Sequence, residues 1–361
     1  MASSPSSPSN IAILRLEQSL CGIGTALNVF VLFLIYKKSS KELANYKYFL
    51  FSFVSCDVLY SVFHVVVEPV VAVRGGALLI YGRGWLRDRV SISVYSCVVS
   101  QCLVLISYHF IYRALVVTQN LWYFAIHPRK VAFFLVLICS AFFSLWFWVV
   151  FAFFRMREGQ FGEIAAFAAE NAEEFPKNYS YELVMIVGKN SVTGAVDLTT
   201  IAGVCVMLAA CSLSIGAIIL STIASFPPAS FPIPLSVSPQ QRRLFIALLV
   251  QFSVPMACIY CPFSLLIILP FFPHSGMSIP VWVGGLFYSF YPIGDSLAIL
   301  LLIADYRRAC VALGWWLVRS SLARPFNVLP DTVDFHPDDI DIFIEENNSL
   351  YYRTRQQKDM R

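Results

Sequence analysis

The sequence predicts an all-α membrane protein in which seven transmembrane helices form a bundle and a short interfacial helix follows. First, seven apolar runs are each long enough to cross a hydrocarbon core of about 30 Å, which takes ~20 helical residues. Second, none of these runs contains Lys or Arg. Third, 13% of the residues are charged, about half the usual share of a soluble domain. The runs cover residues 18–36, 48–72, 90–112, 131–154, 195–224, 244–269 and 281–303.

Helices are expected rather than strands. Every backbone polar group inside lipid must find a partner within the protein, so only helices or closed barrels can span. Barrel strands are short and alternate between apolar and polar residues, whereas these runs are long and uniformly apolar. Pro255 and Pro292 interrupt the sixth and seventh runs, and each is expected to bend its helix.

The Lys and Arg distribution predicts an outside N-terminus and a cytoplasmic C-terminus. Residues 1–17, rich in Ser and Pro and without the basic start of a signal peptide, are interpreted as an extracellular N-terminus. With this orientation the inner loops carry more Lys and Arg than the outer ones. Asn178 begins an Asn-Tyr-Ser sequon in an outer loop and is the expected glycosylation site; a second sequon at Asn347 would lie inside and stay unused.

Four segments follow from this topology: the N-terminus 1–17, the membrane domain 18–303, an interfacial amphipathic helix 304–320 and a flexible cytoplasmic tail 321–361. The interfacial helix is indicated by arginines interleaved with Trp315 and other apolar residues. The tail is indicated by an acidic stretch without Lys or Arg. Cys310, beside two arginines, is either a palmitoylation site or an ordinary interfacial cysteine.

Buried polar residues predict a network inside the bundle. Asn28, Asp57 and Asp295, in the first, second and seventh runs, all lie about 12–14 Å from the inner boundary at ~1.5 Å per residue. Three roles remain open: a hydrogen-bonded packing network, a shared cation or proton site that switches the bundle, or the aspartate pair of an intramembrane hydrolase. The residues around the two aspartates do not favour the third role.

The sequence gives no support for an enzyme, a cofactor, a metal site or nucleic-acid binding. It contains no HExxH, no Walker A motif and no nucleophile elbow. Nine of the ten cysteines lie inside apolar runs, where a cysteine acts as a small hydrophobic residue.

Four segments, taken in their order and spacing, resemble nematode seven-transmembrane chemoreceptors of the Str superfamily. The resemblance covers about residues 11–308, and the tail lies outside it. Two features depart from the pattern: Ser296 stands where the family usually has proline, and no acid immediately precedes Arg113. The segments are 109–113 (HFIYR), 240–248 (QQRRLFIAL), 291–297 (YPIGDSL) and 305–307 (DYR).

The resemblance implies a rhodopsin-like G-protein-coupled receptor in the plasma membrane of sensory cilia. An odorant or soluble cue would bind in the outer half of the bundle, and a heterotrimeric G protein and anionic lipids would bind the inner face. The alternative is a seven-helix ligand-gated channel or transporter. Expected ligand contacts are His64, Glu68, Tyr95, Gln101, Tyr260 and Tyr288, with Ser96, Asp197 and Tyr291 as further candidates. Expected G-protein contacts are Arg113, Arg242 and Arg243.

Overall fold

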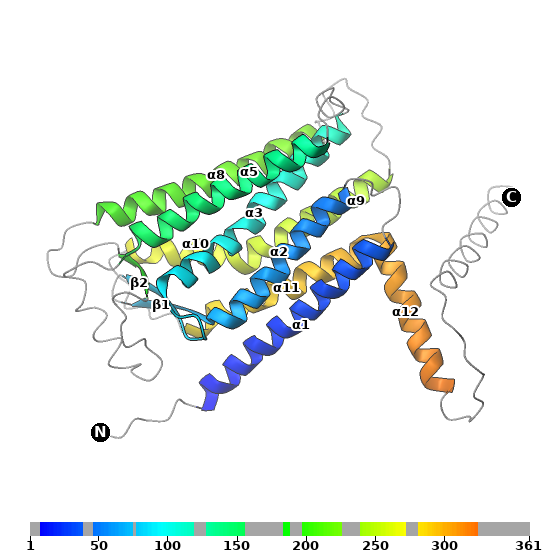
Figure 1. Cartoon of the computed structure of the whole chain (residues 1–361), viewed down its shortest axis with the longest axis horizontal. Helices are drawn as coiled ribbons and strands as arrows, with labels where there is room; N and C mark the ends of the chain where they lie inside the picture. The colour runs from blue at the N-terminus through cyan, green and yellow to red at the C-terminus, as the bar shows by residue number, and fades with distance from the viewer. Residues whose placement is uncertain are drawn as a thin grey trace. The chain divides into compact units, whose positions relative to one another are not determined.

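A computed structural model of the chain describes residues 8–38, 46–74, 77–118, 128–155, 183–187, 197–225, 239–271 and 281–323. Seven helices in these ranges are long and apolar enough to cross a membrane, which confirms the predicted seven-helix bundle (Figure 1). The spans are formed by α1 (Pro8–Lys38), α2 (Tyr46–Val67), α3 (Arg89–Val117), α5 (Pro128–Trp148), α8 (Leu198–Ser225), α9 (Pro239–Pro255) with its continuation, and α11 (Val281–Leu302).

Two spans change helix type along their length. The fourth, α5, continues as the π-helix η1 (Val149–Phe153). The sixth continues after Pro255 as the π-helix η2 (Met256–Tyr260), the α-helix α10 (Cys261–Ile268) and the short 3-10 helix η3 (Leu269–Phe271). The predicted interruption at Pro255 therefore coincides with a change of helix type, whereas α11 passes through Pro292 as one α-helix.

The helix α3 is the central one of the bundle. Of the 18 most apolar consecutive residues of α3, 72% are buried, which is a larger share than in the corresponding stretch of any other described span. It packs against α2, α5, α8 and α9, while α1 packs on α2 and α11 (Figure 1). Gly24 allows α1 to pack this closely on α11, because a Cβ atom at this position would lie 2.7 Å from the Cβ of Pro292.

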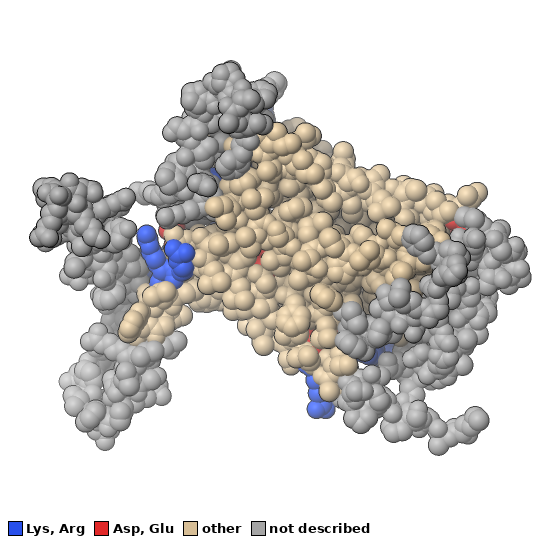
Figure 2. All heavy atoms as spheres, turned by 180° about the vertical axis from the view of Figure 1, so that it is seen from behind, with Lys and Arg blue, Asp and Glu red and all other residues tan. Residues whose placement is uncertain are grey.

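Side chains facing away from the bundle are mostly apolar. On the face shown in Figure 2, the described residues carry few charged side chains. Large exposed hydrophobic residues such as Phe133, Leu213 and Leu220 lie on α5 and α8. Such a surface is stable in lipid rather than in water.

A three-stranded antiparallel sheet covers the end of the bundle where α1 begins, here called the predicted outer end. Its order is β1 (Pro69–Arg74), β2 (Ala77–Gly82) and β3 (Val184–Val187), with Val71 opposite Ile80 and Leu79 opposite Met185. The second run was predicted to be helical through residue 72, and this boundary was wrong. The helix ends at Val67 because Glu68 adopts a φ of 46° and proline follows.

The helix α12 (Ala304–Ala323) occupies the stretch predicted to be interfacial. Its residues through Val311 belong to the same compact unit as the bundle, and the residues from Ala312 belong to a second unit. The interfacial position of α12 stays a prediction. The predicted tail lies outside the described residues from residue 324 onward.

Candidate functional site

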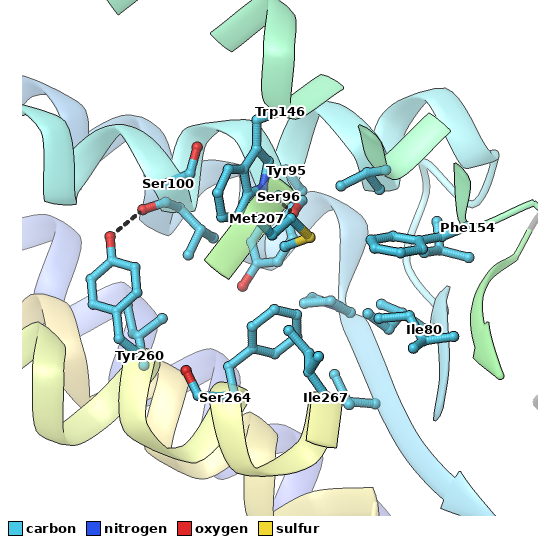
Figure 3. A pocket seen from close by; sticks show the side chains of 18 of the residues that line it. Ile80, Tyr95, Ser96, Ser100, Trp146, Phe154, Met207, Tyr260, Ser264 and Ile267 are labelled. Atoms are coloured by element: carbon cyan, nitrogen blue, oxygen red, sulfur yellow. Dashed lines mark hydrogen bonds between the residues drawn. The ribbon is translucent and has the colours of Figure 1, made fainter. Parts of the chain in front are cut away.

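A cavity lies inside the bundle next to the sheet (Figure 3). Its volume is about 80 Å³. Helices α3, α8 and α10 form half of its wall, together with Trp146 from α5, Tyr60 from α2 and Tyr288 from α11. The sheet closes it with Pro69, Val71, Ile80, Val184 and Ile186.

The wall of the cavity carries no charged side chain. Its polar groups are mainly hydroxyls, and most of these already have partners inside the protein. Tyr95 Oη lies 2.8 Å from His64 Nδ1. Ser96 Oγ accepts a hydrogen bond from Trp146 Nε1 at 2.9 Å. The wall therefore suits an uncharged guest.

Tyr288 carries a buried hydroxyl of this wall that has no such partner among the described residues. Its side chain is 5% exposed and lines the cavity, and its hydroxyl has no hydrogen-bond partner within the described ranges. A buried hydroxyl without a partner is costly. A guest molecule that pairs with Tyr288 Oη would remove this cost.

The structure brings some of the predicted ligand residues together and separates others. Tyr95, Tyr260 and Tyr288 line the cavity together with Ser96. His64 stands behind Tyr95, and Ser289 Oγ lies 3.4 Å from its other ring nitrogen, Nε2. Gln101 is absent from the cavity wall, and its amide nitrogen is buried without a partner among the described residues.

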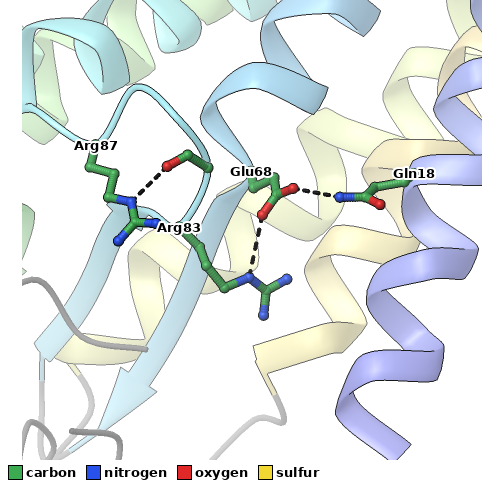
Figure 4. Close-up of polar contacts among 5 residues, drawn as sticks. Gln18, Glu68, Arg83 and Arg87 are labelled. Atoms are coloured by element: carbon green, nitrogen blue, oxygen red, sulfur yellow. Dashed lines mark hydrogen bonds and ion pairs between the residues drawn. The ribbon is translucent and has the colours of Figure 1, made fainter. Parts of the chain in front are cut away.

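Glu68 lies outside the cavity, because the chain turns at this residue. Its carboxylate accepts a hydrogen bond from Gln18 Nε2 at 2.5 Å and lies 3.7 Å from Arg83 Nε (Figure 4). It therefore joins α1 to the segment after β2. Asp197 also has a local role, since it caps α8 by accepting from the N–H groups of Thr199 and Thr200.

Sequence reasoning missed most of the cavity wall. Trp146, Phe154, Met207 and Ile267 contribute apolar surface to the cavity, as do the sheet residues. An apolar side chain in an apolar run carries no signal that separates a ligand contact from a core or lipid contact. The helix-type change near Phe154 had no sequence signal, and the one at Tyr260 had only two prolines of the sixth run, Pro255 and Pro262.

The buried polar residues lie deeper in the bundle. Asn28, Asp57 and Asp295 are fully buried. Tyr291 donates a hydrogen bond to Asp57, and the electrostatic neighbours of Asp295 include Asp57. Asn28 Nδ2 instead bonds the carbonyl oxygens of residues 24 and 292, at 3.0 and 3.2 Å, so it joins α1 to α11.

Gln251 is a further member of this cluster that sequence reasoning did not single out as a site residue. It is another neighbour of Asp295 and is 1% exposed. Both polar atoms of its amide, like both carboxyl oxygens of Asp295, are buried without a hydrogen-bond partner among the described residues. Within those same residues, no three His, Cys, Asp or Glu side chains gather in a way that could hold a metal ion.

At the opposite end of the bundle, Arg113 is buried near the end of α3. Its guanidinium carbon lies 5.7 Å from the centre of the Tyr46 ring, so an aromatic side chain of α2 contacts the cation. Tyr46 in turn packs edge-on against His109, with 5.6 Å between ring centres.

Three other predicted sites differ in how much of them the structure describes. Arg242 and Arg243 belong to α9, but their side chains lie outside what the structure describes, and so does the whole of Asn178. Cys310 is half-buried on α12, and burial raises the pKa of its thiol. A raised pKa keeps the thiol protonated and makes it a weaker nucleophile.

The family comparison matches this architecture. The model of the family described as "Serpentine type 7TM GPCR chemoreceptor Str" matches residues 15–311, which include all seven spans and the cavity. No curated protein matches the chain. Since the family match covers most of the sequence, the chain belongs to the serpentine seven-transmembrane GPCR chemoreceptors of the Str family.

Proposed function

We propose that this receptor detects a small uncharged molecule in the cavity beside the sheet and activates a heterotrimeric G protein through its inner face. The observation that carries the proposal is the cavity wall, which combines apolar side chains and hydroxyls and has no charge. Moving an unpaired ion into such a site costs several kcal/mol or more. Carboxylates and ammonium ions are therefore excluded as ligands.

The size of the cavity supports a ligand of few heavy atoms. An apolar cavity of about 150 Å³ in another protein holds benzene, and this one measures about 80 Å³. Tyr288 gives the ligand a hydrogen-bonding contact, because its hydroxyl is buried and without a partner among the described groups. The class proposed is thus a small ketone, alcohol, ether or ester.

The inner face is proposed as the G-protein contact. Arg113 is buried near the end of α3, and Arg242 and Arg243 belong to the first turns of α9. This assignment requires the N-terminus outside, with Asn178 glycosylated and the C-terminus in the cytoplasm. The proposed setting is the ciliary plasma membrane of a nematode chemosensory neuron, with anionic lipids beside the basic loops and a lipid anchor at Cys310.

The test is a ligand panel applied to cells that express the full chain with a G-protein reporter. Matched series of ketones, hydrocarbons, carboxylates and ammonium ions of equal carbon count would be compared. Neutral members are expected to activate, and charged members are not. In Tyr288→Phe, the concentration for half-maximal response to ketones is expected to rise about tenfold, which is the worth of one hydrogen bond.

A control variant separates this effect from expression. Tyr36 lies on α1 with 79% of its surface exposed, so Tyr36→Phe makes the same chemical change far from the cavity and is expected to respond like the wild type. Responses only to charged members would refute the ligand class. A ligand-gated current that persists without any G protein would instead favour the channel or transporter alternative.

A further inference from the structure

The hydroxyl of Tyr260 bonds two backbone groups of α3. It donates to the carbonyl oxygen of Val99 at 2.9 Å (Figure 3). It also accepts from the N–H of Leu103 at 3.0 Å. These two groups are four residues apart, so they are each other's natural partners in an α-helix. A side chain of the sixth span therefore bonds to both backbone groups of one step in the hydrogen-bond ladder of α3.

Tyr260 also lies where its own span changes helix type. It is the last residue of the π-helix η2, which begins directly after Pro255. The N–H of Cys261 donates to the carbonyl of Met256, five residues back. Prolines and π-turns both interrupt the regular ladder and are common sites of bending.

The π-helix η2 is here called the hinge. On the α9 side of the hinge, the sixth span contacts α3 through aromatic rings. Phe110 packs edge-on against Phe245 and Phe252, with 5.7 and 6.1 Å between ring centres. Ring contacts of this kind tolerate small shifts, whereas the hydrogen bonds of Tyr260 are directional. The hydroxyl therefore fixes the position of the hinge on α3 more tightly than the rings do.

We propose that Tyr260 is a latch that holds the sixth span to α3 in the resting receptor and that a ligand releases it. Tyr260 and Val99 both line the cavity, so a bound molecule can compete for the same hydroxyl. When the hydroxyl leaves, Val99 and Leu103 can pair with each other, so α3 keeps its hydrogen bonds. Two arrangements with satisfied backbone groups are what a switch requires.

This inference rests on the proposed receptor function, and its first test is ligand-independent signalling. Tyr260→Phe removes the hydroxyl and retains the ring, and α3 can close its own ladder. G-protein signal per receptor at the cell surface, without added ligand, is expected to rise about two- to tenfold, as the loss of one ordinary hydrogen bond allows. Ser253→Ala is the matched control, because Ser253 Oγ bonds only within α9, to the carbonyl of Leu249.

A second measurement does not depend on any G protein. Hydrogen–deuterium exchange of the purified full-length chain in lipid nanodiscs would be compared for the wild type and both variants. Amides 245–260 are expected to exchange faster in Tyr260→Phe and at wild-type rates in Ser253→Ala, since a released hinge opens more often.

The two measurements separate two kinds of failure. Unchanged exchange in Tyr260→Phe overturns the latch, and so does an unchanged or lower ligand-independent signal where the wild type does signal. Faster exchange with no G-protein signal from any variant, the wild type included, would retain the latch as a restraint on the hinge and refute the proposed coupling.

Discussion

The hydroxyl of Tyr60 donates a hydrogen bond to the carbonyl oxygen of Tyr288, 2.9 Å away. In an unbroken helix this carbonyl would accept from residue 292, but Pro292 has no N–H. A side chain of α2 thus supplies the donor that α11 lacks. Both tyrosines line the cavity, so the same residues supply the missing donor at the proline site and form part of the cavity wall.

Tyr60→Phe is expected to destabilise the bundle. The variant leaves the carbonyl of Tyr288 buried without this donor, which costs about 1–3 kcal/mol. The change would be measured as a lower melting temperature, taken as the temperature at which half of the purified protein in detergent is no longer monodisperse. Tyr48→Phe on the exposed face of the same helix is the control; equal melting temperatures for both variants would show that water replaces the Tyr60 hydroxyl.

Gly24→Ala is expected to separate α1 from α11. The new Cβ would lie 2.7 Å from Pro292 Cβ and 3.3 Å from the nitrogen of residue 293, which is too close on both counts. Overpacking of this kind costs about 1–3 kcal/mol. Gly22→Ala makes the same change two residues earlier with no atom within 4 Å, and its helix propensity favours folding. A melting temperature lowered equally by both changes would contradict this account.

Asp88 is expected to make the start of α3 sensitive to acid. Its carboxylate accepts from the N–H of Ser91 at 2.9 Å and from the Ser91 hydroxyl. Partial burial raises the pKa of Asp88, but these hydrogen bonds lower it more, so the net pKa lies below its ordinary value. The stabilisation is present above the ordinary value of about 3.9 and is lost as the pH falls through the lower folded value.

Asp88→Asn tests this sign. Asparagine still caps a helix but does not titrate there, whereas Asp88→Ala loses the cap at a cost of about 0.5–2 kcal/mol. At neutral pH the asparagine variant is expected to melt near the wild type and the alanine variant lower. At a pH below the folded value, the gap between wild type and alanine is expected to close. A gap that stays constant with pH would exclude the carboxylate as its source.

Arg113→Ala is expected to reduce signalling more than surface expression. The guanidinium is buried against the ring of Tyr46 at the inner end of the bundle, where the G protein is proposed to bind. Reporter signal divided by surface label is the measurement. Tyr46→Phe keeps an aromatic face for the cation and is expected to retain more signal. Equal loss of signal and expression in Arg113→Ala would assign a purely structural role to the arginine.

The seven spans could be predicted because lipid imposes length and apolarity on every helix that crosses it. The sheet could not. The strand after Glu68 is as apolar as the helix before it, and both faces of β3 are buried, so no alternation marks it as a strand. The turn depends on the backbone of Glu68, a residue that rarely adopts positive φ.

The candidate site was predictable only in its polar part. Tyr95, Tyr260 and Tyr288 stood out as polar groups in apolar runs, and all three line the cavity. His64 and Glu68 stood out for the same reason but pair with other protein groups, because spacing along a helix gives the face of a residue and not its partners. The bonds of Tyr260 to α3 depend on the π-helix; Pro255 predicted an interruption of the span there, but no local pattern predicted that it would be a π-helix.

The sheet has a consequence for how receptors of this kind diversify. Five of its residues belong to the cavity wall, yet its strands lie in the connections between helices and not in the spans. Such connections tolerate replacement better than packed helices do. Exchange of β1, β2 and β3 between relatives would therefore change the preference for the proposed ligand. The proposed hinge, the buried acids and the inner face would stay the same. Ligand range and signal output could then evolve separately.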